Sequence, residues 1–234
     1  MSRKIKVLSF DLDDTLWPNL PTILNAEDLL YQWLKQNVPQ ITDRYNSRQL
    51  RDKRLSCLEK HPEFSHDLSA LRLLSFERLA EELSLSKEWV QPAFDVFYSA
   101  RQQVTLFDDV KPVLDELSSR FQLVSLTNGN ASTVETNVDH WFNFSLNSAS
   151  VGKCKSEPDM YWHVQKIAGI SAGQMMHIGD HPKQDVAGAQ SAGVYAIWLN
   201  REKQPWPLQQ AQECKPDAEI HSLYELPALL NRIG

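Results

Sequence analysis

Short, nearly continuous apolar runs recur along the chain and alternate with segments whose apolar residues are three to four positions apart. The runs are Ile5–Phe10, Phe121–Thr127, Met175–Gly179 and Val194–Leu199. Runs of this kind are typical of strands that a parallel sheet buries on both faces. The spaced segments predict helices over Val110–Arg120, Glu157–Ala168 and Gln184–Ala192. Strands alternating with such helices predict an α/β fold, a doubly wound and mainly parallel sheet.

The stretch between Trp17 and Gln103 has a different pattern. "AEDLLYQWLKQ", "SRQLRDKRLSCLEK", "LSALRLLSFERLAEEL" and "EWVQPAFDVFYSARQQ" all carry helical periodicity, and none resembles a buried strand. We therefore expect a helical cap domain over residues 17–103, inserted into a core domain of residues 1–16 and 104–234. Trp33 and Trp89 are expected in the core of the helical domain. The proline-interrupted segment Lys203–Gln210 is expected to be a surface loop.

Composition narrows the class of protein and of partner. A chain of 234 residues with 42% hydrophobic and 23% charged residues is typical of a soluble globular protein. The net charge of −6, without a Lys/Arg stripe, argues against nucleic acid as a partner. Cys57, Cys154 and Cys214 lack metal-site spacing and favour a reducing compartment. With no run long enough for a signal peptide or a membrane span, we expect a cytoplasmic protein that does not bind membranes.

Polar and charged residues follow three of the predicted strands. The first run is followed by Asp11, Asp13 and Asp14, and the second ends in Thr127 and leads into Asn128-Gly129-Asn130. The third run is followed by Asp180 and then by Asp185. The segment "GKCKSEP", which contains Lys153 and Lys155, precedes a predicted helix. In a doubly wound sheet, ligands bind outside the carboxyl ends of the strands. The position of these residues at the ends of successive strands therefore predicts a single ligand-binding site at that edge of the sheet. Any one of these aspartates alone would more simply be a helix cap or a turn residue.

The acidic residues of this predicted site need a cation. In an extended chain Asp11 and Asp13 point to the same side, while Leu12 points inward. Two carboxylates so close repel each other. With Asp180 and Asp185 there are four negative charges against one lysine, which leaves −3. Carboxylate oxygens with several waters suit Mg²⁺, so the pattern predicts a magnesium site.

The segments "DLDDTL", "LTNGN", "KSEPDMY" and "IGDHPKQDVAGAQSAG" resemble, in this order, the four motifs of the haloacid dehalogenase superfamily. The resemblance extends over the whole chain, including a helical cap between the first two motifs. In general likeness the chain is similar to bacterial phosphatases that act on FMN and on 5-amino-6-(5-phospho-D-ribitylamino)uracil, an intermediate of riboflavin biosynthesis. Two positions depart from the usual pattern. Ser156, in place of proline, follows Lys155, and Asp14 replaces a frequent glycine.

The resemblance implies a Mg²⁺-dependent phosphatase that forms an aspartyl phosphate and takes a small phosphorylated metabolite. Asp11 would be the nucleophile, and Asp13 would protonate the leaving group and later accept a proton from water. The carboxylates of Asp11 and Asp180, with the backbone carbonyl of Asp13, would hold Mg²⁺.

The remaining motif residues would bind the phosphoryl group. The Thr127 hydroxyl and the Asn128 backbone N–H would bind its oxygens, and Lys155 would offset charge between Asp11 and the phosphoryl group. Asp185 would orient Lys155 or a metal-bound water. Lys155 is preferred over Lys153 because Pro158 and Tyr161 then fall in register with the motif.

Several alternatives remain open from the sequence. Dehalogenases of this fold lack an aspartate at the position of Asp13, because their halide leaving group needs no proton; Asp13 thus favours phosphate esters. A phosphomutase, or a phosphatase for other sugar or nucleotide phosphates, shares these motifs. A receiver-type switch is shorter and has no inserted helices. Trp17 is either a substrate wall or packing, Cys154 and His177 are expected to be packing residues, and His181 a loop residue.

Overall fold

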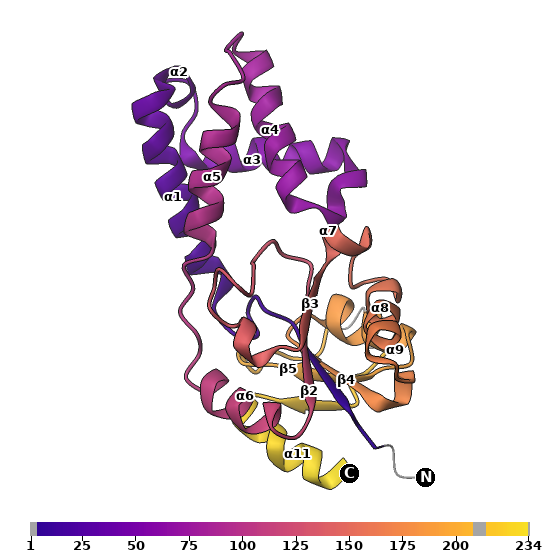
Figure 1. Cartoon of the computed structure of the whole chain (residues 1–234). Coiled ribbons are helices and arrows are strands. Elements are labelled where there is room, and N and C mark those ends of the chain that lie inside the picture. The colour runs from indigo at the N-terminus through magenta and orange to yellow at the C-terminus, as the bar shows by residue number, and fades with distance from the viewer. Residues whose placement is uncertain (1–3, 208–213, 234) are drawn as a thin grey trace. The chain divides into compact units, whose positions relative to one another are not determined.

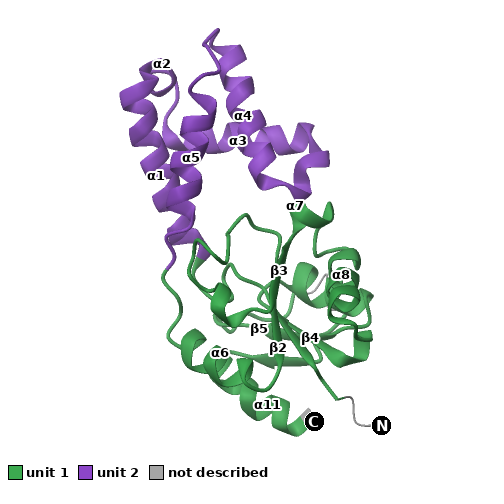
Figure 2. Cartoon of the chain, viewed as in Figure 1, with its two compact units in different colours: residues 1–18, 105–234 green, residues 19–104 purple. Residues whose placement is uncertain are grey.

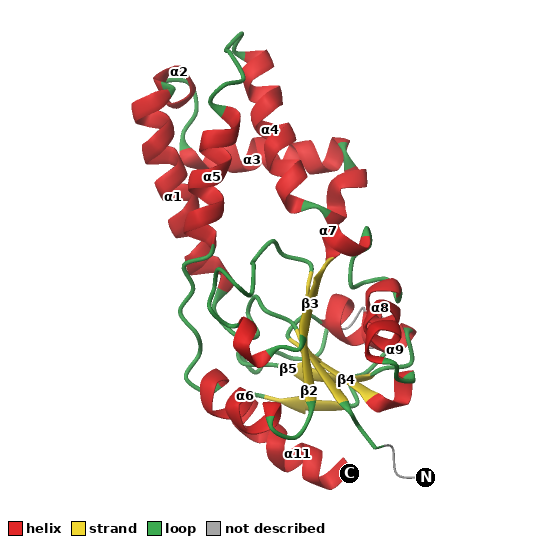
Figure 3. Cartoon of the chain, viewed as in Figure 1, coloured by secondary structure: helices red, strands yellow, loops and turns green. Residues whose placement is uncertain are grey.

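The computed structural model describes residues 4–207 and 214–233. It divides into two compact units (Figure 2): Met1–Pro18 with Thr105–Gly234, and Asn19–Val104. The first unit contains a sheet that has six strands within the described residues (Figure 3), in the order β3-β2-β1-β4-β5-β6 and with every neighbouring pair parallel. The strands are β1 (Val7–Phe10), β2 (Gln122–Thr127), β3 (Phe144–Asn147), β4 (Met175–Gly179), β5 (Tyr195–Leu199) and β6 (Ala218–Ile220). The predicted doubly wound fold is confirmed.

The position of β1 explains its sequence. It lies between β2 and β4, with Val7 opposite Gln122 on one side and opposite Met175 on the other. All four residues of β1 are buried, as an apolar run without alternation requires. Since β1, β2 and β4 are adjacent and parallel, the segments that follow Phe10, Thr127 and Gly179 emerge at the same edge.

Helices cover the two faces of this sheet. Within the described residues they are α6 (Val110–Ser118), α7 (Ser148–Val151), α8 (Asp159–Ala168), α9 (Gly188–Ser191) and α11 (Leu226–Ile233), with shorter turns η2 (Asp139–Trp141), η3 (Ala172–Gln174) and η5 (Leu223–Glu225). Figure 1 shows α6 and α11 on one side of the sheet and α8 and α9 on the other. Met160 and Val164 of α8 pack with Val124 and Leu126 of β2 in one buried cluster. The apolar side of α8 therefore covers the sheet, as its helical spacing predicts.

The structure corrects one predicted element and adds two strands. The helix expected over Gln184–Ala192 is a π-helical turn, η4 (Pro182–Ala187), followed by the short helix α9. Strands β3 and β6 were not predicted, because β3 is a half-buried edge strand and β6 has three residues with an exposed glutamate at its centre. Lys203–Pro207 forms no regular element, as expected for a loop, whereas Leu208–Gln210 lie outside the described residues.

The second unit is helical, as the periodicity predicts. Its elements are α1 (Asn19–Asn37), α2 (Pro39–Thr42), α3 (Ser47–Lys60), η1 (Pro62–His66), α4 (Leu68–Glu82) and α5 (Val90–Arg101). Trp89 lies in its buried core, and Trp33 is partly buried against the same cluster. Within the described ranges, no helix is both long and apolar enough to span a bilayer.

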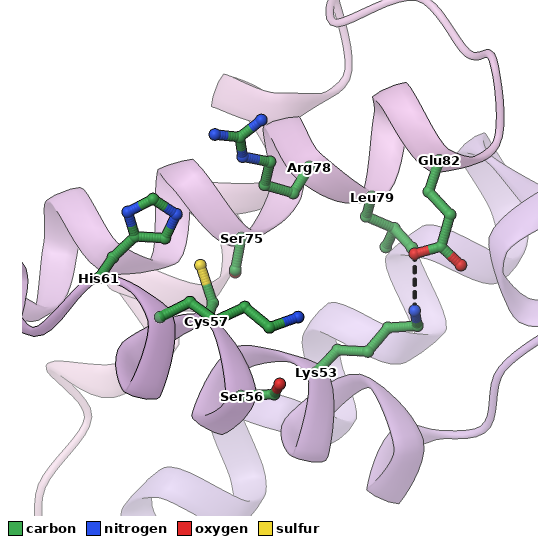
Figure 4. Close-up of a pocket in the computed structure, with 9 residues that line it drawn as sticks. Lys53, Ser56, Cys57, His61, Ser75, Arg78, Leu79 and Glu82 are labelled. Atoms are coloured by element: carbon green, nitrogen blue, oxygen red, sulfur yellow. Dashed lines mark hydrogen bonds and ion pairs between the residues drawn. The ribbon is translucent and has the colours of Figure 1, made fainter.

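A cavity of about 350 Å³ opens between α3 and α4 (Figure 4). Its wall is rich in basic side chains, and carboxylates pair with two of them. Lys53 pairs with Glu82 at 2.6 Å, and Arg78 pairs with Glu81 at 3.2 Å. These two pairs are exposed to solvent, and pairs of this kind contribute little to stability.

Candidate active site

The loop after β1 delivers the first aspartates to the edge of the sheet. The Asp11 N–H donates to the carbonyl of Ile178 at 2.9 Å, so the pairing with β4 continues one residue beyond the strand. Asp11 is buried, with 6% of its surface exposed, and Leu12 is wholly buried. The chain then turns at Asp14, whose φ of 56° lies in the left-handed region. Asp tolerates that region better than most residues, so Asp14 can occupy this turn in place of the glycine that is frequent in the motif.

Asp13 is partly buried and is held by Trp17. The indole Nε1–H of Trp17 donates to Asp13 Oδ1 at 2.9 Å, and the Asp14 N–H donates to the Trp17 carbonyl at 2.8 Å. The four-residue spacing of the turn thus places the indole against the carboxylate. Trp17 is wholly buried, which supports packing over a substrate wall, and its indole also orients the Asp13 carboxylate.

Lys155 is the lysine that reaches Asp11. Its Nζ lies 2.5 Å from Asp11 Oδ1 and 2.6 Å from Asp185 Oδ1, and only 1% of the side chain is exposed. Burial works against the charge, but Asp11 and Asp185 stabilise it and raise the pKa of Lys155 above its usual value. Lys153 instead pairs with Glu157 on the surface at 2.8 Å.

Three carboxylates gather beside Lys155. Among the described residues, Asp11, Asp180 and Asp185 each offer an oxygen within 4.8 Å of the others. The Asp13 carboxylate is outside this group. Asp180 is also reached by the Thr15 hydroxyl, which donates to its Oδ1 at 3.4 Å. Sequence reasoning assigned no role to Thr15.

The pKa values in this cluster reflect crowded negative charge. Burial raises the pKa of Asp11 well above its usual value, and burial together with the neighbouring Asp185 raises that of Asp180 to about 7. Asp185 differs: burial alone would raise its pKa, but Lys155 and His177 hold it well below the usual range. With all three carboxylates ionised and Lys155 protonated, these four side chains carry a net charge of −2. Hard carboxylate oxygens with excess negative charge are suited to a divalent cation, so these residues could hold one.

The end of β2 contributes Thr127 and Asn128. The Thr127 hydroxyl oxygen accepts the Gly129 N–H at 2.9 Å, which leaves its own proton available for an acceptor in the site. The Asn128 side chain ties two other loops to β2. Its Oδ1 accepts the Lys155 N–H at 2.8 Å, and its Nδ2 donates to Gln184 Oε1 at 2.9 Å. Only the backbone N–H of Asn128 was assigned a role from the sequence.

The position of Asp185 depends on the π-helical turn and on Gly179. The His181 N–H donates to Asp185 Oδ2 at 2.8 Å, while the His181 ring accepts the Lys183 and Gln184 N–H groups and caps the turn. A Cβ at Gly179 would lie 2.3 Å from Asp185 Cγ. Glycine at 179 is therefore what lets the carboxylate approach β4.

His177 packs in the core as predicted, but it also has polar contacts that the sequence did not indicate. It is wholly buried and meets Tyr161 edge-on at 5.2 Å, as a packing residue would. Both ring nitrogens nevertheless have polar partners, Asp185 and Ser9. Burial lowers the pKa of the ring, so it is neutral. A single histidine inside an apolar strand carries no local signal of such contacts.

Comparison with known proteins agrees with the fold and identifies the family. The model of the haloacid dehalogenase-like hydrolases matches residues 5–193. The chain is 29% identical to the Escherichia coli (strain K12) 5-amino-6-(5-phospho-D-ribitylamino)uracil phosphatase YigB, with 97% of each chain covered. It is 24% identical to the Mus musculus N-acylneuraminate-9-phosphatase, over 98% of this chain and 95% of that one.

Among solved structures, a 2-haloacid dehalogenase from Pseudomonas syringae pv. Tomato DC3000 superimposes with a TM-score of 0.90. That protein is 35% identical, and the match covers 98% of this chain and 100% of the other. The family model covers most of the chain, from the strand before Asp11 to the turn after Asp185, and so includes every residue of the acidic cluster and Lys155. The chain therefore belongs to the haloacid dehalogenase-like hydrolases.

Proposed function

We propose that this hydrolase is a Mg²⁺-dependent phosphatase that cleaves small phosphate monoesters through an aspartyl phosphate on Asp11. The observation that carries the proposal is the placement of the Asp11 carboxylate. It contacts the Lys155 ammonium at 2.5 Å and shares an acidic cluster with Asp180 and Asp185. A buried carboxylate held by one cation, at the edge of the sheet where ligands bind, is suited to attack an anionic phosphorus centre.

The assignment to the phosphoric monoester hydrolases rests on the family and on several relatives. The chain is a phosphoric monoester hydrolase, in common with its phosphatase relatives from Escherichia coli and Mus musculus. Asp13 suits the hydrolysis of phosphate esters, because an alkoxide leaving group needs a proton and a positioned carboxylic acid can donate it.

In the proposed reaction, Asp11 Oδ attacks phosphorus and the ester P–O bond breaks. Asp13 gives its proton to the leaving oxygen, and the bond from Trp17 holds that carboxylate in place. Asp13 then takes a proton from the water that hydrolyses the aspartyl phosphate, which restores Asp11 and releases inorganic phosphate. Water is the one co-reactant, and its oxygen leaves in the inorganic phosphate.

The phosphoryl oxygens have donors at two strand ends. The free proton of the Thr127 hydroxyl and the Asn128 N–H would bind them, and the Lys155 ammonium would offset charge as it develops. The Asn128 side chain holds the backbone of Lys155, so these donors belong to one connected unit. Preorganised donors of this kind need no reorganisation during the reaction.

The proposed Mg²⁺ site makes the activity depend on the metal. Asp11 and Asp180, with the Asp13 carbonyl, would hold Mg²⁺, which when bound neutralises charge on the cluster and on the phosphoryl oxygens. We expect excess EDTA to abolish phosphate release and added Mg²⁺ to restore it. Mg²⁺ should also raise the unfolding temperature of the EDTA-treated protein, because a ligand that binds only the folded state stabilises it. Full activity in excess EDTA would contradict the magnesium site.

For the substrate, we propose FMN or 5-amino-6-(5-phospho-D-ribitylamino)uracil, and with it a place in riboflavin biosynthesis. The support is the name of the Escherichia coli relative, which is matched along nearly its full length. The test is a screen of phosphate release from these two esters, sugar phosphates, nucleotides and phosphorylated acids, ranked by kcat/KM. We expect one of the first two to rank highest. A higher kcat/KM for another class would replace this substrate and leave the phosphatase proposal in place.

A second candidate is haloacid dehalogenation, because the Pseudomonas syringae structure bears that name. Asp13 argues against it in this chain, since a carbon–halogen bond breaks without a proton donor. The same screen therefore includes 2-chloropropionate, with halide release as the readout. We expect no halide release above the uncatalysed rate. Steady release of inorganic phosphate from the esters would likewise separate a phosphatase from a phosphomutase.

A further inference from the structure

A chain of buried polar contacts extends behind Asp11, away from the edge where the substrate would bind. Lys155 Nζ contacts Asp185 Oδ1 at 2.6 Å, and His177 Nε2 lies 3.0 Å from the same oxygen. On the other side of the ring, Nδ1 lies 2.8 Å from Ser9 Oγ. The side chains of Lys155, Asp185 and His177 are all at most 1% exposed, so water does not compete for these contacts.

The contacts determine which ring nitrogen carries the proton. The Lys155 ammonium against Asp185 Oδ1 favours the ionised carboxylate, which can only accept, and this makes Nε2 the donor toward it. Nδ1 of the neutral ring is then an acceptor, and the Ser9 hydroxyl is its donor. The other acceptor near Ser9 Oγ, the carbonyl of Met176, is farther away at 3.4 Å.

Asp185 receives three donors, and together they leave its carboxylate one orientation. Oδ1 takes Lys155 and His177, whereas Oδ2 takes the His181 N–H at 2.8 Å. The backbone of Gly179 closes the remaining side. Without the donor from His177, the ammonium on its flexible stem would be the one remaining side-chain donor to Oδ1, and the His181 N–H would hold Oδ2 alone.

We infer that His177 is a positioning residue: its Nε2–H orients Asp185, which in turn holds the Lys155 ammonium against Asp11. Ser9 supports this role by selecting the tautomer. The expected effect on catalysis rests on the proposed function. The contacts of the His177 ring do not depend on that function. His177 contacts no reacting atom, so its effect reaches the reaction through Asp185 and Lys155.

The first experiment compares His177→Gln with His177→Asn. Both introduce a neutral amide, but the longer Gln can place its NH₂ where Nε2 lies, whereas Asn reaches only the position of Nδ1. We expect kcat of H177N to be lower than that of H177Q by about tenfold or more, the usual effect of losing a buried hydrogen bond to a charged group. KM should differ by less than about threefold, because the lost interaction acts on developing charge.

The control is the unfolding temperature of the two variants, since a merely structural role would change stability and not the ratio of kcat values. Equal kcat values for two folded variants would overturn the inference. So would a deficit in H177N that appears in KM alone.

A second measurement needs no variant and no activity. In the wild-type protein, the long-range ¹H–¹⁵N spectrum of the His177 ring reports which nitrogen is protonated. We expect the proton on Nε2, and a proton on Nδ1 alone would overturn the inference even if the variants did not fold. If the enzyme released no phosphate from any ester, the proposed function would fail, but the ring spectrum would still decide the tautomer.

Discussion

Replacing Asp11 by Asn is expected to lower kcat/KM for phosphate release by at least about a thousandfold, because an amide cannot attack phosphorus as a carboxylate does. Asn has nearly the same volume as Asp. It can still accept a hydrogen bond from Lys155, which contacts Asp11 at 2.5 Å in the wild-type protein. The variant should therefore fold, which its unfolding curve and circular dichroism would establish.

The matched control is Asp14→Asn, the same chemical change three residues along the same loop. Asp14 has a left-handed φ of 56°, a conformation that Asn also tolerates, and it has no assigned role in the reaction. We expect D14N to keep kcat/KM within about threefold of the wild type. An Asp11→Asn variant with more than a trace of wild-type turnover would show that the nucleophile is elsewhere. Mass spectrometry of acid-quenched wild-type enzyme should find the phosphoryl group on the peptide that contains Asp11.

Replacing Lys155 by Ala is expected to reduce kcat severely, by at least about a hundredfold, because the charge between Asp11 and the phosphoryl group would lose its offset. The same change leaves Asp11 and Asp185 without their shared cation in a buried site. Removing one partner of a buried ion pair costs about 3–5 kcal/mol, so the free energy of unfolding should also fall. Urea denaturation would measure this second effect separately from the kinetics.

Lys153→Ala is the control for this prediction. Lys153 lies two residues earlier, has nearly half of its side chain exposed and pairs with Glu157 on the surface. Surface pairs contribute little, so K153A should change neither kcat nor the free energy of unfolding appreciably. The reverse order, with K153A severe and K155A mild, would overturn the choice of Lys155.

The acidic cluster has a physical consequence for how the site holds together. Asp185 has a well-lowered pKa because Lys155 and His177 stabilise its charge, whereas burial raises the pKa of Asp11 and Asp180. Lys155 contacts both Asp11 and Asp185, and His177 adds a second partner for Asp185 alone. The contact between Asp185 and Lys155 supports the proposal that Asp185 orients this lysine, one of the two roles that the motif alone left open.

The candidate residues could be found from the sequence because most of them lie at the end of a recognisable element. Asp11 and Asp180 directly follow buried strands and Thr127 ends one, and the structure has β1, β4 and β2 at those places. Parallel strands in one sheet bring such residues together whatever the details of the loops. For the lysine, the register of the motif favoured Lys155 over Lys153, and the fold buries Lys155 against Asp11 and leaves Lys153 on the surface.

Other features left no readable signal. The π-helical turn Pro182–Ala187 was predicted as part of an ordinary helix, because a periodicity near 3.6 residues does not reveal one wider turn. Strands β3 and β6 are too short and too polar to stand out. The Asn128 side chain bonds a residue 56 positions away, and the His177 ring bonds one 168 positions away. No local pattern encodes such distances.

The sequence by itself determined the alternation of strands and helices, the helical insertion after the first strand and the order of polar residues at the strand ends. These features follow from local periodicity and from the burial of apolar runs, which neighbouring residues specify. Only the tertiary structure decided which lysine is buried, how Asp185 is oriented and that His177 belongs to the same polar chain. These outcomes depend on contacts between distant segments and on the exclusion of water, both of which exist only once the sheet has formed.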